Sequence, residues 1–484
     1  MKKMVLAVCL LAALAGSAAA QPALEKGMDS KRFTTEELNK VRYVGAVDRN
    51  SCWITEGKKH VKQVAVLNVD LESPVTVVLP GSGDMNVLAA SIEGRHVAVM
   101  LADQSEKKRT VVYRAEVDLD TRSVRSYDTL LAFGYDRKDQ CMVWGATSPD
   151  GRYNALVGIL QYHDSERYQS MVVLYDANMN SIWNKEFALG SMHDLMVTNE
   201  GRIVTFGRED YDSEVRFVFN TIDADRAASY AASVKCDPLE DVHLVSVVGP
   251  YAVAAGTYHP SEGRKADQFT AGVIALSFHL DSATLSGITM RPFQNEDINM
   301  FLNRKTKKIQ KEQQCDHIVN LGTTPTPFGG VIALGRRVLV ETTSQNGVVK
   351  RAGRTTGVHM AAIDTLGRVR WVRNLRRNAV QKEGDEMLGL GVSYVDGKVC
   401  VVMTESPKSP TVYDIADDAR EVSVGSSGNV VLYTVSNTGD TQKLLLERKV
   451  KQAVFRQVAG RNDGLLFFSG NGKKCRLAEL KFHY

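Results

Sequence analysis

Three histidines begin similar apolar segments and are the residues best suited by type and spacing to do chemistry. His193 begins HDLMV, His243 begins HLVSVV and His317 begins HIVNLG. Each has an aspartate within two residues along the chain: Asp194, Asp241 and Asp316. Imidazole exchanges protons near neutral pH and is the commonest metal ligand in proteins. If the three segments are equivalent parts of a repeat, these histidines could act as acid and base or converge on a metal ion.

A second candidate site is a strongly basic stretch in the last third of the chain. Residues 336–382 contain eleven lysines and arginines against only Glu341 and Asp364. A positive surface of this kind would attract an acidic envelope protein or an anionic glycan. The arginines that we assign to it are Arg368, Arg370, Arg373, Arg376 and Arg377. Acidic runs at residues 209–214 and 414–421 could instead neutralise it within the fold.

The elements that must position these residues are short β-strands. After Val41, apolar segments of five to eight residues alternate with turns such as Asp150-Gly151 and Asp396-Gly397, a pattern typical of all-β proteins. Hairpins that are apolar on both strands, as buried strands are, alternate with hairpins that are half polar and carry an Asp near the turn. An inner and an outer hairpin recurring in this way predict the four-stranded antiparallel blade of a β-propeller.

The strand count leaves a ring of seven or eight blades. Eight apolar hairpins are visible, but the last blade, which ends at residues 475–482, shows only three strands. A propeller commonly completes its last blade with a strand from the other terminus, so the N-terminal hairpin could fill that place and leave seven blades. A solenoid or two β-sandwiches would produce a similar strand pattern.

Two of the outer hairpins share a detailed plan. In VVLYDANMNSIWNKEFAL and MAAIDTLGRVRWVRNL, an apolar strand runs into Asp176 or Asp364, and Trp183 or Trp371 follows seven residues later. On this Asp and Trp, the chain resembles the WD40-like propeller repeats of pyrroloquinoline-quinone-type proteins and their cofactor-free relatives, such as the outer-membrane assembly scaffold. It is also similar to exported bacterial propeller proteins of unknown role. The resemblance implies a fold and a compartment, and we assign neither a cofactor nor a metal.

In a propeller, the starts of the innermost strands surround one end of the central channel, so His193, His243 and His317 would lie there. The alternative, which we favour, is that they cap strand ends and hydrogen-bond neighbouring backbone. The chain has no G-x-S-x-G nucleophile motif, no phosphate-binding loop and no adjacent cysteine pair of a quinone dehydrogenase. Propeller glycosidases and lyases take their acids and bases from separate blades, so an enzymatic role stays possible without a local motif.

The N-terminus predicts export. MKKMVLAVCLLAALAGSAAAQ has two lysines, an apolar run too short for a membrane span and small residues before a cleavage site, so residues 1–20 are expected to be a signal peptide. We expect the mature chain to lie in the periplasm rather than outside the cell, with a polar segment at residues 21–41, a propeller at residues 42–484 and no transmembrane segment. The net charge of +4 falls to +2 without Lys2 and Lys3, so nucleic acid is not an expected partner.

Two further features complete the prediction. The six cysteines after the signal peptide lie 75 to 95 residues apart, and we expect buried free thiols rather than disulfides. Residues 291–315 are polar and interrupt the strand rhythm. Their apolar residues at near-helical spacing predict one short amphipathic helix, packed on the ring or used to dock a partner; these residues are Ile298, Phe301, Leu302 and Ile309.

The sequence therefore predicts an exported binding or scaffolding propeller of the bacterial cell envelope, without enzymatic activity and with its ligand or protein partner on one face. The alternative is a carbohydrate-active enzyme, a glycosidase or lyase, whose site lies at the channel end and uses the three histidines.

Overall fold

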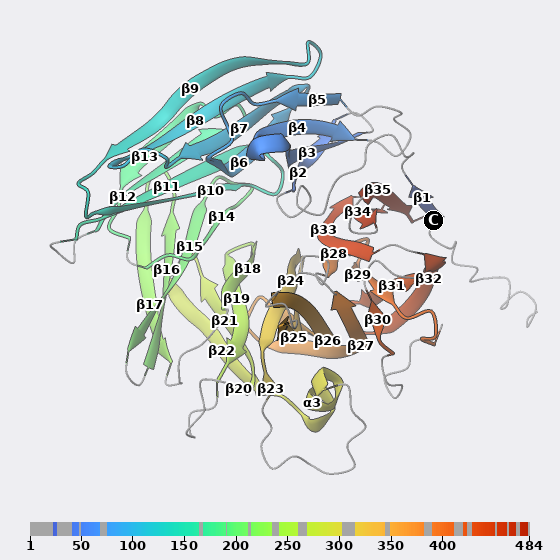
Figure 1. Ribbon diagram of the computed structural model, residues 1–484. Helices are drawn as coiled ribbons and strands as arrows, with labels where there is room; N and C mark the ends of the chain where they lie inside the picture. The colour runs from blue at the N-terminus through green and yellow to red at the C-terminus, as the bar shows by residue number, and fades with distance from the viewer. Residues whose placement is uncertain are drawn as a thin grey trace, which may run out of the picture.

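The strands form a ring of antiparallel sheets (Figure 1). The computed structural model describes residues 23–26, 41–47, 50–67, 75–163, 168–189, 191–211, 214–234, 242–259, 269–302, 315–343, 349–381, 390–410, 420–423, 428–450, 453–461, 464–470 and 475–482. Within these ranges there are seven four-stranded sheets and one five-stranded sheet, each of which is a blade of a β-propeller. With the five-stranded sheet included, the described residues form eight blades.

The first four blades use consecutive strands, from the innermost to the outermost. They are β2 (Arg42–Val47), β3 (Asn50–Glu56), β4 (Lys62–Leu67) and β5 (Val75–Val78); β6 (Met85–Glu93), β7 (His96–Asp103), β8 (Arg109–Asp118) and β9 (Ser123–Gly134); β10 (Gln140–Thr147), β11 (Tyr153–Gln161), β12 (Tyr168–Asp176) and β13 (Ser181–Glu186); and β14 (Asp194–Val197), β15 (Ile203–Tyr211), β16 (Glu214–Ile222) and β17 (Ala227–Val234). A short 3-10 helix, η1 (Lys58–His60), joins β3 to β4.

The last four blades contain additions and the closing strand. They are β18 (His243–Val248), β19 (Tyr251–Tyr258), β21 (Gly272–His279) and β22 (Thr284–Pro292); β24 (Ile318–Thr326), β25 (Gly329–Thr343), β26 (Val349–Asp364), β27 (Val369–Gln381) and the added β30 (Val422–Ser423); β28 (Gly391–Val395), β29 (Lys398–Glu405), β31 (Gly428–Ser436) and β32 (Thr441–Val450); and β33 (Ala453–Arg461), β34 (Gly464–Gly470), β35 (Cys475–Lys481) and β1 (Ala23–Lys26). A separate pair joins β20 (Phe269–Thr270) to β23 (Cys315–Asp316).

The inner and outer hairpins of the sequence prediction are confirmed. In β7, HVAVMLAD, six consecutive residues are buried, because the second strand of a blade has sheets on both of its faces. In β9, the outermost strand of the same blade, every residue is exposed or only partly buried. The all-β propeller with four-stranded antiparallel blades is therefore confirmed.

A strand from the N-terminus completes the last blade, as the sequence allowed, but it is not the strand pair named there. The hairpin β2–β3 begins a blade of its own, and the last blade is completed by β1, which lies in the segment expected to be a polar extension. β1 pairs antiparallel with β35, from Ala23 opposite Lys481 to Lys26 opposite Ala478. The predicted signal peptide and the short helix expected at Thr34 to Lys40 lie outside the described residues.

The core lies between blades rather than inside any one of them. Each large apolar cluster joins two successive sheets, as expected for a fold whose units bury their faces against neighbours. Between the fourth and fifth blades, Phe219 contacts both Phe206 and Phe278 with ring centroids 4.8 Å apart. Among the described cysteines, Cys52, Cys141 and Cys400 are free and buried, as predicted.

The predicted helical insertion is α3 (Asn295–Leu302), which follows β22. Ile298, Met300 and Phe301 are buried in the cluster between the fifth and sixth blades, so the helix packs on the ring. Ile309, the last apolar residue of the predicted helix, lies outside the described residues. No helix in the described part of the chain is long and apolar enough to cross a membrane.

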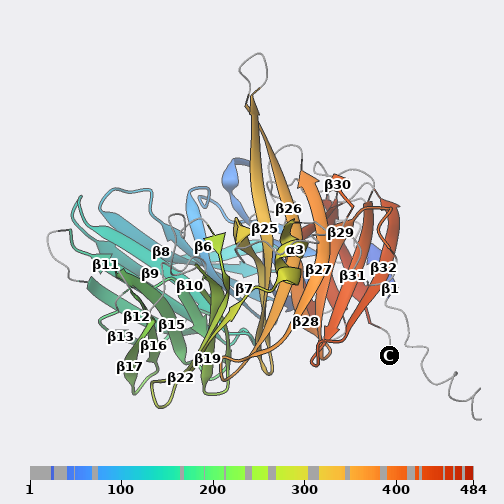
Figure 2. The same ribbon diagram turned by 90° about the horizontal axis from the view of Figure 1, so that it is seen from below.

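One hairpin projects far from the ring. β25 and β26 extend beyond all other strands, as Figure 2 shows most clearly. Where the structure describes the connection between the second and third strands of a blade, it lies on this side, because strands alternate in direction. We call the side that carries the β25–β26 hairpin, η1 and residues 104–108 the hairpin face, and the opposite side, with turns such as residues 176–181, the turn face.

Candidate functional site

The predicted histidines begin the innermost strands of three successive blades, at the channel end of the hairpin face. His193 directly precedes β14, His243 is the first residue of β18, and His317 directly precedes β24. The three histidines therefore occupy equivalent positions in their blades, at the start of the innermost strand. His193 and His317 are exposed, whereas His243 is half-buried.

The structure gives one of these histidines a carboxylate partner. Nδ1 of His243 lies 3.1 Å from Oδ1 and 3.2 Å from Oδ2 of Asp194, on the adjacent blade. A carboxylate in this position fixes the orientation of the ring and the proton on Nδ1. The pair has the composition of an oriented general acid or base.

The same carboxylate has a structural task. Oδ2 of Asp194 accepts a hydrogen bond of 2.9 Å from the backbone N–H of Leu244. Asp194 thus joins β14 to the first two residues of β18, across the boundary between two blades. The hydrogen bond to the strand backbone is therefore made by the aspartate, whereas the sequence led us to expect it from the histidines.

The other two histidines show different local geometry. The backbone N–H of His193 donates to Phe206 O at 2.7 Å. His317 has a φ of 56°, unusual for a residue with a side chain, and its carbonyl accepts from the backbone N–H of Arg337 at 2.8 Å. Asp241 and the side chain of Asp316 lie outside the described part of the structure. Within the described residues, no three His, Cys, Asp or Glu side chains form a group that could hold a metal ion.

The five predicted arginines lie on or beside β27, and the structure places them in different surroundings. Arg368 and Arg370 are exposed, and the guanidinium of Arg370 lies over the ring of Phe328 at 4.7 Å. Arg373 and Arg376 are half-buried, whereas Arg377 is only 4% exposed. The five therefore do not form one continuous solvent-exposed patch.

Arg373 makes a contact between blades. Its Nε donates to the carbonyl of Gly439, in the outer turn of the next blade, where Trp371 Nε1 also donates to Asn437 O at 3.2 Å. The side chain predicted to bind a partner therefore holds neighbouring sheets together.

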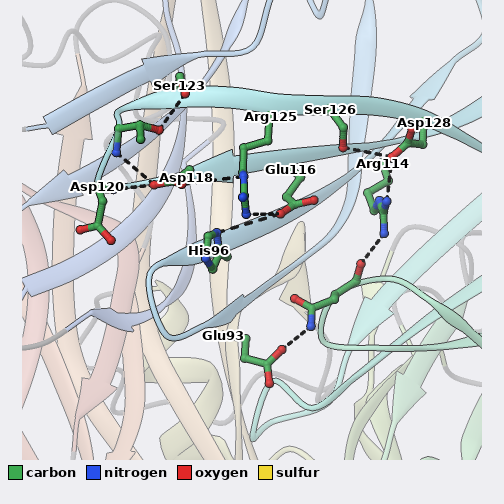
Figure 3. Close-up of polar contacts among 12 residues, drawn as sticks. Glu93, His96, Arg114, Glu116, Asp118, Asp120, Ser123, Arg125, Ser126 and Asp128 are labelled. Atoms are coloured by element: carbon green, nitrogen blue, oxygen red, sulfur yellow. Dashed lines mark hydrogen bonds and ion pairs between the residues drawn. The ribbon is translucent and has the colours of Figure 1, made fainter.

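The same arrangement recurs around the turn face. Arg114 of the second blade donates to Asn178 O at 2.9 Å, in the outer turn of the third blade, and to Asp128 at 2.7 Å on its own blade (Figure 3). Arg202 of the fourth blade pairs with Asp281 of the fifth at 2.6 Å. These arginines stabilise the ring.

Arg377 belongs to a buried charged cluster on the hairpin side of the sixth and seventh blades. Burial lowers the pKa of Arg377 to about 10, although the nearby Glu405 carboxylate opposes the shift. Glu405 accepts from Tyr433 Oη at 2.5 Å and from Lys443 Nζ at 2.6 Å. Arg377 is thus part of the interior, where it contributes positive charge beneath the surface.

The sequence analysis missed a second buried polar group, under α3. Asp297 Oδ1 lies 3.2 Å from Nδ1 of His359 and accepts from Asn374 Nδ2 at 2.7 Å. Burial would raise the pKa of Asp297, but the hydrogen bond and charge of His359, with further hydrogen bonds from Asn374 and Gln294 N–H, lower it to about 2. The three residues are far apart in the sequence and share no motif, so no local signal identifies them.

Comparisons with known proteins do not assign the chain to a family. No protein-family model matches the chain, and no curated protein matches it significantly. Among solved structures, the chain is similar to the WD40 domain of SCAP from fission yeast, with 8% identity over 96% of this chain and 99% of that one and a TM-score of 0.39. It is also similar to the polysaccharide lyase Uly1, with 9% identity over 84% of this chain and 91% of that one and a TM-score of 0.38.

A third solved structure is the β-propeller domain of the Trilobed protease from Pyrococcus furiosus. It has 11% identity over 83% of this chain and 98% of that one, with a TM-score of 0.35. None of these likenesses assigns a role to this chain.

Proposed function

We propose that the protein is an exported, non-enzymatic binding or scaffolding propeller of the bacterial cell envelope, which contacts a protein partner or an anionic glycan through its hairpin face. The proposed export, to the periplasm rather than the medium, rests on the signal-peptide pattern of residues 1–20. The observation that carries the binding role is the β25–β26 hairpin, which projects from this face (Figure 2).

A projecting hairpin is poorly explained by stability alone. Two-stranded ribbons are at best marginally stable in water, because neither face is covered. Among the described strands, the part of β25 beyond Arg337 pairs with β26 but not with β24, so the outer part of the ribbon does not extend the pairing of β24 with β25 inside the blade. Long projecting loops on a rigid ring are instead typical of recognition surfaces.

The charge of this region favours an acidic or anionic ligand. Arg354 of β26 is about half exposed and forms an ion pair with Glu421, which precedes β30. The chain itself thus supplies an acidic group to the basic hairpin, as the sequence analysis allowed for residues 414–421. We infer that an external ligand with negative charge, like that of Glu421, binds the other basic residues of this hairpin.

The test is affinity capture with the mature chain from an envelope extract, at low and high salt, with proteins and glycans identified by mass spectrometry. The proposal predicts a stoichiometric ligand whose capture weakens as salt rises. Repeated capture of nothing above background, from extracts made under several growth conditions, would contradict it.

The alternative, a glycosidase or lyase at the channel end, is favoured only by the Asp194–His243 pair. It predicts turnover on a panel of glycans that is lost in His243→Ala and retained in His96→Ala, a substitution on the turn face. Turnover that both variants retain would exclude this site.

A further inference from the structure

The strand β25 has an edge that the blade does not use. β24 pairs with β25 only as far as Ile318 opposite Arg336. β26 continues to pair with it as far as Thr343 opposite Val349. From Val338 to Thr343, the described residues therefore include a partner strand on one side of β25 and none on the other.

An open edge of this kind is unusual in a natural protein. Its row of N–H and C=O groups is a template for another strand, and proteins normally block such edges with lysine, proline or a short strand. The segment VLVETT from Val338 to Thr343 contains one charged residue, Glu341, and neither lysine nor proline, and five consecutive rungs of the ladder lie beyond Val338. The edge is long enough to pair with a short peptide by strand addition.

The opposite side of the same sheet already binds an added strand. β30 pairs in parallel with β27, with Ala379 opposite Val422. Both residues are almost fully buried, and Glu421 next to them forms the ion pair with Arg354. An extended segment with an acidic residue therefore already docks on one edge of this blade.

The charge around the open edge defines the occupant. Residues 336–354 contain five basic residues and one acidic residue, and Glu421 pairs with one of the five, Arg354, so the formal charge of this group is +3; the basic residues are Arg336, Arg337, Lys350, Arg351 and Arg354. A basic strand would be repelled by this charge, whereas an acidic one would be attracted.

We propose that the edge of β25 from Val338 to Thr343 binds an extended acidic segment of a partner protein by strand addition. This inference rests on the proposed binding function and specifies its ligand. Main-chain hydrogen bonds would supply most of the affinity, and the basic side chains would select the sign of the charge.

The test uses the full mature chain and three fluorescent peptides. The first alternates glutamate with valine and threonine over seven residues. The second has lysine in place of glutamate, and the third is the acidic peptide with every second amide N-methylated. We expect the acidic peptide to bind at least about tenfold more tightly than either of the others, because each control loses the charge attraction or the strand hydrogen bonds.

Two kinds of variant locate the binding. In the first, an Asn-Gly turn replaces residues 339–353 and joins Val338 to Arg354, which already face each other in the ladder. This variant is expected to lose peptide binding while its thermal unfolding stays close to that of the parent. In the second, Val340→Pro is compared with Glu341→Pro. Successive N–H groups of a strand point to opposite edges, so only one of these two prolines removes a hydrogen-bond donor from the open edge. The variant that carries this proline should bind the acidic peptide more weakly than the other variant.

Equal binding of the N-methylated peptide, or binding that survives removal of the hairpin, would overturn the inference. These results do not test the proposed function, because that function concerns the whole hairpin face and not only the edge of β25. If the variant without the hairpin still captures its ligand from envelope extract while the acidic peptide does not bind the parent, the binding function stands and the strand-addition site is wrong.

Discussion

The Asp194 carboxylate lies 3.1 Å from His243 Nδ1 and accepts a 2.9 Å hydrogen bond from the backbone N–H of Leu244. One side chain therefore joins two blades at the channel end. A carboxylate that only oriented a catalytic imidazole would not need the second bond. Asp194 therefore stabilises the contact between two blades whether or not His243 is catalytic.

This assignment predicts an unequal effect of the two residues on stability. Asp194→Ala removes both hydrogen bonds and leaves a backbone N–H without its acceptor, so it should lower the free energy of unfolding by about 1–3 kcal/mol. His243→Ala removes one half-exposed contact and should cost less, about 0–1 kcal/mol. Urea unfolding of both variants measures the difference, and equal losses would contradict the structural part of Asp194.

The buried group under α3 predicts a pH dependence. The pKa of Asp297 is lowered to about 2, so its carboxylate stabilises the fold fully above the unfolded pKa of about 3.9 and loses that effect as pH falls through about 2. The contribution at neutral pH is on the order of 2 kcal/mol.

The measurement is the free energy of unfolding of the parent and of Asp297→Asn between pH 2 and pH 7. The gap between them should be largest near neutral pH and should shrink as pH falls below about 4. A gap that does not change with pH would show that ionisation of Asp297 does not stabilise the fold.

The pairing of β1 with β35 predicts that the N-terminal strand is required for ring closure. A chain that begins at Gly27 would leave β35 as an open edge, whereas one that begins at Gln21 retains the four opposed residue pairs. We expect the shorter chain to unfold at a lower temperature and to aggregate on standing. Indistinguishable thermal unfolding and elution of the two chains would contradict this role of β1.

Two neighbouring arginines on β27 should differ in their effect on ring stability. Arg373→Ala removes the hydrogen bond to Gly439 O between blades and should cost about 1 kcal/mol of stability. Arg370→Ala alters an exposed side chain that lies over Phe328, so it should change stability by less than about 0.5 kcal/mol. Arg370 lies beside the turn of residues 364–368, on the turn face, so its loss should leave ligand capture through the hairpin face unchanged.

Local periodicity was sufficient to predict the blades. In β12–β13, Asp176 Oδ1 accepts from the N–H of Asn180 at 2.8 Å and closes the outer turn. Asp364 does the same for Leu366 and Arg368, each at 2.9 Å. The repeated Asp in the sequence is therefore a turn residue, and such a signal needs no knowledge of distant contacts.

The surroundings of the candidate site residues could not be predicted in this way. Glu405, 28 residues later in the chain, acts on the charge of Arg377, and Asp297, 62 residues earlier, is the ion-pair partner of His359. A basic run in a sequence shows how many charges are present but not which of them the adjacent blade covers. For the same reason, the sequence showed that three histidines begin equivalent strands but not that Asp194 is the partner of His243.

The central claim, recognition through the hairpin face, is tested most directly by photo-cross-linking in envelope extract. A photoreactive residue would be placed at Lys107 or Lys408 on the hairpin face and, as matched controls, at Arg122 or Thr438 on the turn face; all four are exposed. The account predicts cross-links to one common ligand from the first two positions and none from the controls. Cross-links to that ligand from the turn face alone would contradict it.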